Sequence, residues 1–205
     1  MHEFSKLTFF GTLFFCSFLF AENKIEDIDA ILIRDDSSIG VHAPPNYFLD
    51  KDSASNFGVC SFYIQEGNTF NNSPAVIYAQ IAHPFAKGED GVEKLVKEVA
   101  DPYKAKSPKF KLEKQPAYTS KNKYKFEVRY FLNGPSPNNF EAAAYLKNKK
   151  NILQVIYSAR KESDFTSNIQ AFYNTLDRVS PYSTQMPAFS GSCLYPVQTG
   201  KTPNK

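Results

Sequence analysis

The stretch KYKFEVRYFLNGPSPNNFEAAAYLKNKKNILQVIYSA, residues 123–159, decides the fold. Its first eight residues alternate between charged side chains and the apolar Tyr124, Phe126, Val128 and Tyr130. A period of two predicts a β-strand with one apolar face and one charged face.

Two further strands follow within the same stretch. Residues 133–139 contain two prolines, which lack an N–H group, and Gly and Asn residues that suit a turn, so this segment interrupts the strand. Residues 140–146 predict a second strand that runs back along the first, and residues 147–151 predict another turn. Residues 152–157, ILQVIY, are apolar on both faces, which predicts a strand covered on both sides.

Strands are also predicted before this stretch. Residues 28–34 and 38–43 flank an acidic turn and predict a hairpin, although 28–34 also fits one face of a helix. Residues 58–65 and 75–82 predict two more strands, the second rich in β-branched and aromatic side chains. Residues 51–56 are expected to form a loop.

Two amphipathic helices are predicted. The first is capped by Asp90 with Glu93, carries an apolar stripe, and is expected to end at Asp101-Pro102. The second is expected to start at a cap formed by Ser163 or Asp164 and to end at Ser180-Pro181. The apolar positions of the two helices are Val92, Leu95, Val96 and Val99 in the first, and Phe165, Ile169, Phe172 and Leu176 in the second. Residues 104–120 between them predict a connection, with a short strand at 110–112 as an open alternative.

These elements predict one α+β domain over residues 22–181. An antiparallel sheet of about six or seven strands is covered by two main helices, because amphipathic helices need a surface on which to bury their apolar stripes. The length of 205 residues suits one domain. Residues 182–205 are rich in turn-forming residues and are expected to form a partly disordered tail.

The N-terminal residues 1–21 are predicted to be a secretory signal peptide. Lys6 gives a positive start, residues 7–20 are almost wholly apolar, and Ala21 supplies a small residue for cleavage. Two alternatives stay open, a lipoprotein signal with modification at Cys16 and an uncleaved membrane anchor. The mature protein is therefore expected to be periplasmic or secreted.

Cys60 and Cys193 are the two cysteines that remain after cleavage near Ala21. An even number of cysteines in an exported chain predicts a disulfide between them. The alternative is a reactive or metal-binding thiol, but the sequence contains no Cys-x-x-Cys motif.

Charge is distributed unevenly along the chain. Residues 22–56 hold eight acidic residues against three basic ones, and residues 103–126 hold eight lysines against Glu113 alone. The lysines are Lys104, Lys106, Lys109, Lys111, Lys114, Lys121, Lys123 and Lys125. They predict a possible surface for an anionic ligand, such as anionic lipid or lipopolysaccharide, with nucleic acid unlikely for an exported protein. The alternative interpretation is solvated lysines that prevent aggregation at a sheet edge.

The sequence contains no recognisable catalytic motif. After cleavage the histidines are His42 and His83, and neither lies in a nucleophile elbow or a metal-ligand spacing. Two acidic clusters, 27–29 and 35–36, lack the glycine and distal glutamate of a calcium loop. We therefore expect no enzyme activity, no metal and no cofactor; the alternative is a secreted hydrolase with a site around His83 or His42.

The order of elements resembles the PsbP/Mog1/DcrB-type domain over residues 38–180. The resemblance lies in an opening hairpin that ends in Ile39-Gly40-Val41-His42-Ala43-Pro44, and in a closing helix with Phe165, Ile169 and Phe172 at the same spacing. It implies an α/β/α sandwich and a non-catalytic domain that binds a protein partner or an envelope component. It implies no binding residues, and the oligomeric state stays open.

Overall fold

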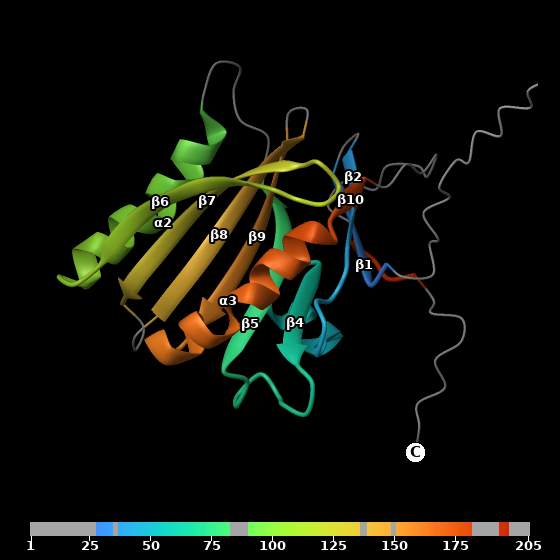
Figure 1. Cartoon of the computed structure of the whole chain (residues 1–205), viewed down its shortest axis with the longest axis horizontal. Helices are drawn as coiled ribbons and strands as arrows, with labels where there is room; N and C mark the ends of the chain where they lie inside the picture. The colour runs from blue at the N-terminus through green and yellow to red at the C-terminus, as the bar shows by residue number, and fades with distance from the viewer. Residues whose placement is uncertain are drawn as a thin grey trace, which may run out of the picture.

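The computed structural model describes residues 28–34, 37–82, 90–135, 139–148, 151–181 and 193–196. Figure 1 shows a large twisted sheet with α3 in front of it, α2 behind it, and a smaller sheet at one end. The predicted α+β class is confirmed.

The main sheet has seven strands in the order β3-β4-β5-β9-β8-β7-β6, and all neighbouring strands are antiparallel. The strands are β3 (Tyr47–Leu49), β4 (Ser61–Gln65), β5 (Ala75–Ala82), β6 (Lys111–Thr119), β7 (Lys125–Gly134), β8 (Asn139–Asn148) and β9 (Asn151–Ala159). The predicted three-strand meander is confirmed as β7, β8 and β9. β9 lies inside the sheet between β5 and β8, which explains why its sequence is apolar on both faces.

The strand register sorts side chains onto two faces, because successive residues point to opposite sides of a sheet. On the face toward α3, cross-strand neighbours include Val128, Ala144, Val155 and Ala79. On the face toward α2, the matching neighbours are Arg129, Ala143, Ile156 and Tyr78. We call these the α3 face and the α2 face.

α3 (Glu162–Asp177) buries the predicted apolar stripe on the α3 face. The Phe165 ring lies 5.3 Å from the ring of Tyr130 and 5.5 Å from that of Tyr157. The predicted ends of the helix are wrong: its N-cap is Lys161, which makes no side-chain cap bond, and it ends at Asp177. The hydroxyl of buried Tyr157 donates to backbone carbonyl groups in the first turn and fixes this end to the sheet instead.

α2 (Gly91–Lys106) packs on the α2 face through Val92, Val96 and Ala100. Asp90 caps it as predicted, accepting a hydrogen bond from the Val92 backbone N–H. The predicted end at Asp101-Pro102 is wrong, because the helix continues through Pro102. Beyond the proline, the Tyr103 ring lies 6.5 Å from the Phe131 ring of β7, and its hydroxyl donates to the Glu141 carboxylate of β8 at 3.2 Å. These tertiary contacts hold the last turn of the helix on the sheet, although Pro102 donates no backbone hydrogen bond.

A third, short helix replaces the loop expected at 51–56. α1 (Lys51–Phe57) starts at Asp50, whose carboxylate accepts from the Ser53 backbone N–H at 3.1 Å. It ends at Gly58, which adopts a left-handed φ of 64°. The prediction of a loop at 51–56 was wrong because it did not take into account that Asp50 and Gly58 can cap a short helix at its two ends.

The smaller sheet has the order β10-β2-β1-β11. Its strands are β1 (Ala30–Arg34), β2 (Ser37–Val41), β10 (Ser180–Pro181) and β11 (Cys193–Leu194). The predicted hairpin is confirmed, and the helical alternative for residues 28–34 is wrong. The predicted disulfide joins Cys60 to Cys193, which holds β11 beside the main sheet.

The predicted signal peptide, including Cys16 and Ala21, lies outside the described residues, as do 182–192 and 197–205 of the predicted tail. Among the described helices, none has the length and apolar character needed to cross a bilayer.

We expect the disulfide to contribute strongly to stability, because it closes a separation of 133 residues that is costly to close in the unfolded chain. Replacing both Cys60 and Cys193 with alanine should lower the free energy of unfolding by about 2–4 kcal/mol. Urea unfolding followed by circular dichroism measures the change. The wild-type chain in reducing buffer should match the variant; equal midpoints for oxidised wild type and variant would contradict the prediction.

Candidate functional site

β6 is the edge strand of the main sheet and carries the lysine-rich segment. Figure 1 shows β6 and β7 as a long hairpin that curves along one side of the molecule and over one end of α3. The sequence predicted a connection here, with a short strand at 110–112 at most. That expectation is wrong because β6 pairs with β7 only and is exposed on both faces, so it lacks the apolar alternation that reveals a strand.

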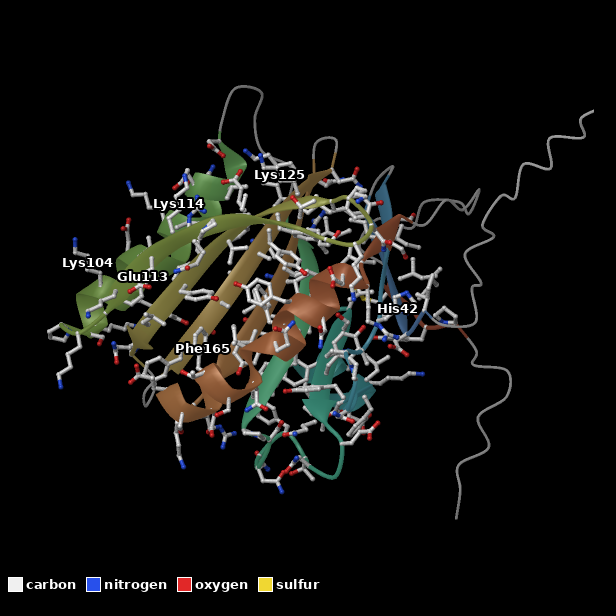
Figure 2. All side chains as sticks on the ribbon, viewed as in Figure 1. His42, Lys104, Glu113, Lys114, Lys125 and Phe165 are labelled. Carbon is white, nitrogen blue, oxygen red and sulfur yellow. A yellow bond between two sulfur atoms is a disulfide. The ribbon has the colours of Figure 1, made fainter. Side chains whose placement is uncertain are left out.

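All eight predicted lysines are exposed. Lys104 and Lys106 lie in the last turns of α2, and Lys109 lies between α2 and β6. The others are in β6 (Lys111 and Lys114), in the turn after it (Lys121 and Lys123) and at the start of β7 (Lys125). Figure 2 shows Lys104, Lys114 and Lys125 spread along the β6 side of the molecule, with Glu113 among them. We call this set, Lys104, Lys106, Lys109, Lys111, Lys114, Lys121, Lys123 and Lys125, the lysine rim. A nine-residue strand spans about 30 Å, so the rim is elongated and does not form a compact pocket.

A bulge divides β6 into two parts. Residues 111–115 pair in regular register with residues 128–132 of β7, and pairing resumes only at Tyr118. Pro116, which has no N–H to donate, lies in the interruption. The regular part places Leu112 and Lys114 toward the α2 face and Lys111 and Glu113 toward the α3 face. Leu112 is 42% exposed and is the apolar member of this edge.

Asp177, at the end of α3, anchors the turn between β6 and β7. Its carboxylate accepts hydrogen bonds from the Tyr118 hydroxyl at 2.9 Å and the Lys121 backbone N–H at 3.0 Å. The Lys121 ammonium lies 3.4 Å from its second oxygen. The Asn122 side chain donates to the Val179 carbonyl oxygen, and the Tyr118 ring packs 4.9 Å from the Tyr173 ring. These contacts hold the lysine-bearing turn against α3.

Burial alone would raise the pKa of Asp177, but the hydrogen bonds from Lys121 and Tyr118 outweigh it and hold the pKa below its ordinary 3.8. Burial and the bond to Asp177 raise the pKa of Tyr118 to about 12. The Tyr118 hydroxyl therefore stays protonated and donates to an ionised carboxylate at neutral pH.

The charged face predicted for the strand over 123–130 is partly covered. Arg129 is only 2% exposed and lies under the first turns of α2. Its guanidinium forms ion pairs with Glu93 at 2.5 Å and Glu127 at 3.3 Å, and Lys147 lies 3.3 Å from both Glu127 and Asp90. The charged face is therefore partly buried, because α2 packs on this side and Glu93 of its first turn pairs with the buried guanidinium of Arg129. This network fastens α2 to the sheet.

The alternative catalytic and calcium residues are not brought to the lysine rim. His83, Asp27 and the pair at 35–36 lie outside the described residues. His42 follows β2, and Figure 2 shows it on the opposite side of the molecule from Lys104 and Lys114. Asp29 accepts a hydrogen bond from the Ala43 backbone N–H and so stabilises the hairpin. Within the described part of the chain, no three His, Cys, Asp or Glu side chains are grouped to hold a metal ion.

No family model matches the sequence, and no curated protein is significantly similar to it. Solved structures are similar. The chain matches the solution structure of cyanobacterial PsbP, CyanoP, from Synechocystis sp. PCC 6803 with 10% identity, over 78% of this chain and 96% of that chain, at a TM-score of 0.48. It also matches the Ran-binding protein Mog1p of Saccharomyces cerevisiae with 10% identity, over 69% of this chain and 89% of that chain, at a TM-score of 0.44.

The predicted resemblance to PsbP/Mog1-type domains is confirmed as a resemblance of fold. The similarity of fold assigns no role to the lysine rim. Its possible function is argued only from the contacts and exposure of its own residues. The sequence revealed the lysines but missed Leu112 as an exposed edge residue and Asp177 as the anchor of the turn. An aspartate at a helix end carries no local sign of a partner 56 residues away.

We expect Asp177→Asn to lower the free energy of unfolding by roughly 1–2 kcal/mol at pH 7, because bonds to a charged acceptor are stronger than neutral ones. The folded pKa is below the unfolded value, so this contribution is complete above pH 3.8 and lost as pH falls through the folded pKa. The stability gap between wild type and variant should therefore narrow in acid.

Urea unfolding between pH 7 and pH 2.5 measures this difference. Asp101→Asn is the matched control, since it removes an exposed negative charge on α2. A gap for Asp177→Asn that is constant over the whole pH range would show that the carboxylate charge does not anchor the turn.

Proposed function

We propose that this chain is an exported, non-catalytic binding domain whose negatively charged partner binds along the lysine rim. The partner is a protein or a component of the cell envelope. Export is supported by the apolar N-terminal segment and by the disulfide between the two cysteines of the mature chain, since such bonds persist in oxidising compartments.

The observation that carries the proposal is the exposure of eight lysines between the end of α2 and the start of β7, with Glu113 as the one acidic residue in this stretch of sequence. A surface of one charge sign attracts oppositely charged partners from a distance and raises the rate of association. Asp177 and Tyr118 hold the turn of this edge in place, so part of the rim is presented by an ordered support.

The alternative of a hydrolase built around His42 or His83 has no supporting observation among the described residues. His42 lies away from the lysine rim, at the end of β2. A nucleophilic site would need this histidine beside a serine or cysteine and a carboxylate. The exposed lysines, by contrast, are an observation that favours the binding function.

We expect the purified chain to bind poly-L-glutamate, and the affinity to fall steeply between 50 and 200 mM salt because screening weakens exposed charge pairs. Lys104→Glu together with Lys125→Glu should weaken binding by about tenfold at low salt, since each reversal replaces attraction by repulsion. Isothermal titration calorimetry measures the affinities.

The matched control reverses two exposed lysines away from the rim, Lys51 on α1 and Lys161 before α3, and changes the net charge equally. The control should bind within about twofold of wild type. Equal losses in both variants would show that overall charge alone attracts the polymer, and would contradict a binding surface on the rim.

A further inference from the structure

β6 ends the seven-stranded sheet and uses its backbone hydrogen-bonding groups on one side only. Its pairing partner is β7, and in the described part of the chain no strand lies on its other side. A strand has N–H and C=O groups along both edges, so an open edge is a template for one more strand. Seven of the nine residues of β6 are exposed, and none is buried.

The regular part of this edge is short and has a definite order of side chains. Residues 111–115 keep continuous register with β7, and Pro116 in the bulge ends it, since an added strand cannot accept a hydrogen bond there. Leu112 and Lys114 point to one face, and Lys111 and Glu113 to the other. The edge therefore offers one cation on each face, the exposed carboxylate of Glu113 beside Lys111, and one exposed apolar side chain.

A second copy of the same edge is a poor occupant. Antiparallel pairing of two β6 edges about Glu113 would place this carboxylate against its own copy, whereas pairing about Leu112 would place Lys111 against Glu113 and Leu112 against its own copy. In both registers the lysines of the two rims are brought together, and this repulsion between surfaces of the same charge is what disfavours a second copy. A lipid surface offers negative charge but no backbone groups to complete the edge. An extended acidic polypeptide supplies both.

We propose that β6 accepts an extended acidic segment of a partner protein as an eighth strand, with acidic side chains opposite Lys111 and Lys114 and an apolar side chain opposite Leu112. This inference rests on the proposed function, and it names the partner class and the mode of binding. Main-chain hydrogen bonds would supply affinity, and the charge pairs would select the segment.

The lysines, the proline and the bulge also explain why the edge does not aggregate. Such features reject neutral or basic strands. They do not reject an acidic strand, for which the lysines are attractive. One set of side chains thus excludes unwanted strands and selects the proposed partner.

The test uses the full chain and the labelled peptide acetyl-TVETIEVT-amide. In antiparallel alignment, its two glutamates lie opposite Lys111 and Lys114, and its isoleucine lies opposite Leu112. Fluorescence anisotropy measures binding, and hydrogen exchange measures protection of the β6 amides. We expect binding together with increased protection within residues 111–115.

Two control peptides separate strand pairing from charge attraction. In acetyl-TVEPIEVT-amide a proline removes a backbone N–H and disfavours the strand while keeping both glutamates, and it should bind at least about tenfold more weakly. In acetyl-TVKTIKVT-amide lysines replace the glutamates, and it should not bind wild type. Equal binding of the proline peptide, or unchanged protection of residues 111–115, would overturn the proposal.

Charge exchange tests the alignment. The double substitution Lys111→Glu with Lys114→Glu should lower the affinity for the acidic peptide by about tenfold or more. The same variant should bind the lysine peptide, which wild type does not bind. The control variant with Lys51→Glu and Lys161→Glu should keep the wild-type preference for the acidic peptide over the lysine peptide. If the variant no longer binds the acidic peptide and also does not bind the lysine peptide, the proposed pairing is wrong.

Failure of this inference is distinguishable from failure of the proposed function. If the acidic peptide does not bind but poly-L-glutamate or phosphatidylglycerol vesicles bind through the lysine rim, strand addition is wrong and an anionic binding surface remains. If none of these probes binds, both are wrong.

Discussion

The structure depends on the burial of β9 on both of its faces. Val155 and Tyr157 point into the core under α3, and Ile152 belongs to the cluster under α2. Removing apolar surface from water is the main favourable term in folding, and a central strand contributes it on two sides. The two amphipathic helices therefore settle on opposite faces, and the strands on either side of β9 extend the sheet outward.

Placement of the lysine rim follows from this arrangement. With β9 inside the sheet and β7 and β8 beyond it, β6 is the last strand on its side. A strand in this position gains few apolar contacts, so lysines and a proline cost little stability there and limit edge pairing. The tie between Tyr118 and Asp177 then keeps the hairpin turn on α3.

Sequence patterns predicted the elements whose burial is strongly periodic. The meander, the two amphipathic helices and the opening hairpin were all found, because their apolar residues recur at strand or helix spacing. β6 was missed because an exposed edge strand shows no apolar alternation. The continuation of α2 through Pro102 was missed because the contacts of Tyr103 with Phe131 and Glu141 are tertiary. The burial of Arg129 was not predicted, because its partner Glu93 comes from a helix 36 residues earlier.

The sequence by itself determined the α+β class, the meander, the faces of the two main helices, the disulfide pair and the presence of eight clustered lysines. Only the tertiary structure decided that these lysines lie on and beside an open edge strand, that Arg129 is buried in an ion-pair network, and that Asp177 anchors the turn. The physical reason is range. The spacing of apolar residues and the number of cysteines are local properties that can be read from the sequence. Strand order, charge pairing and the exposure of an edge depend on which segments, distant in sequence, come into contact.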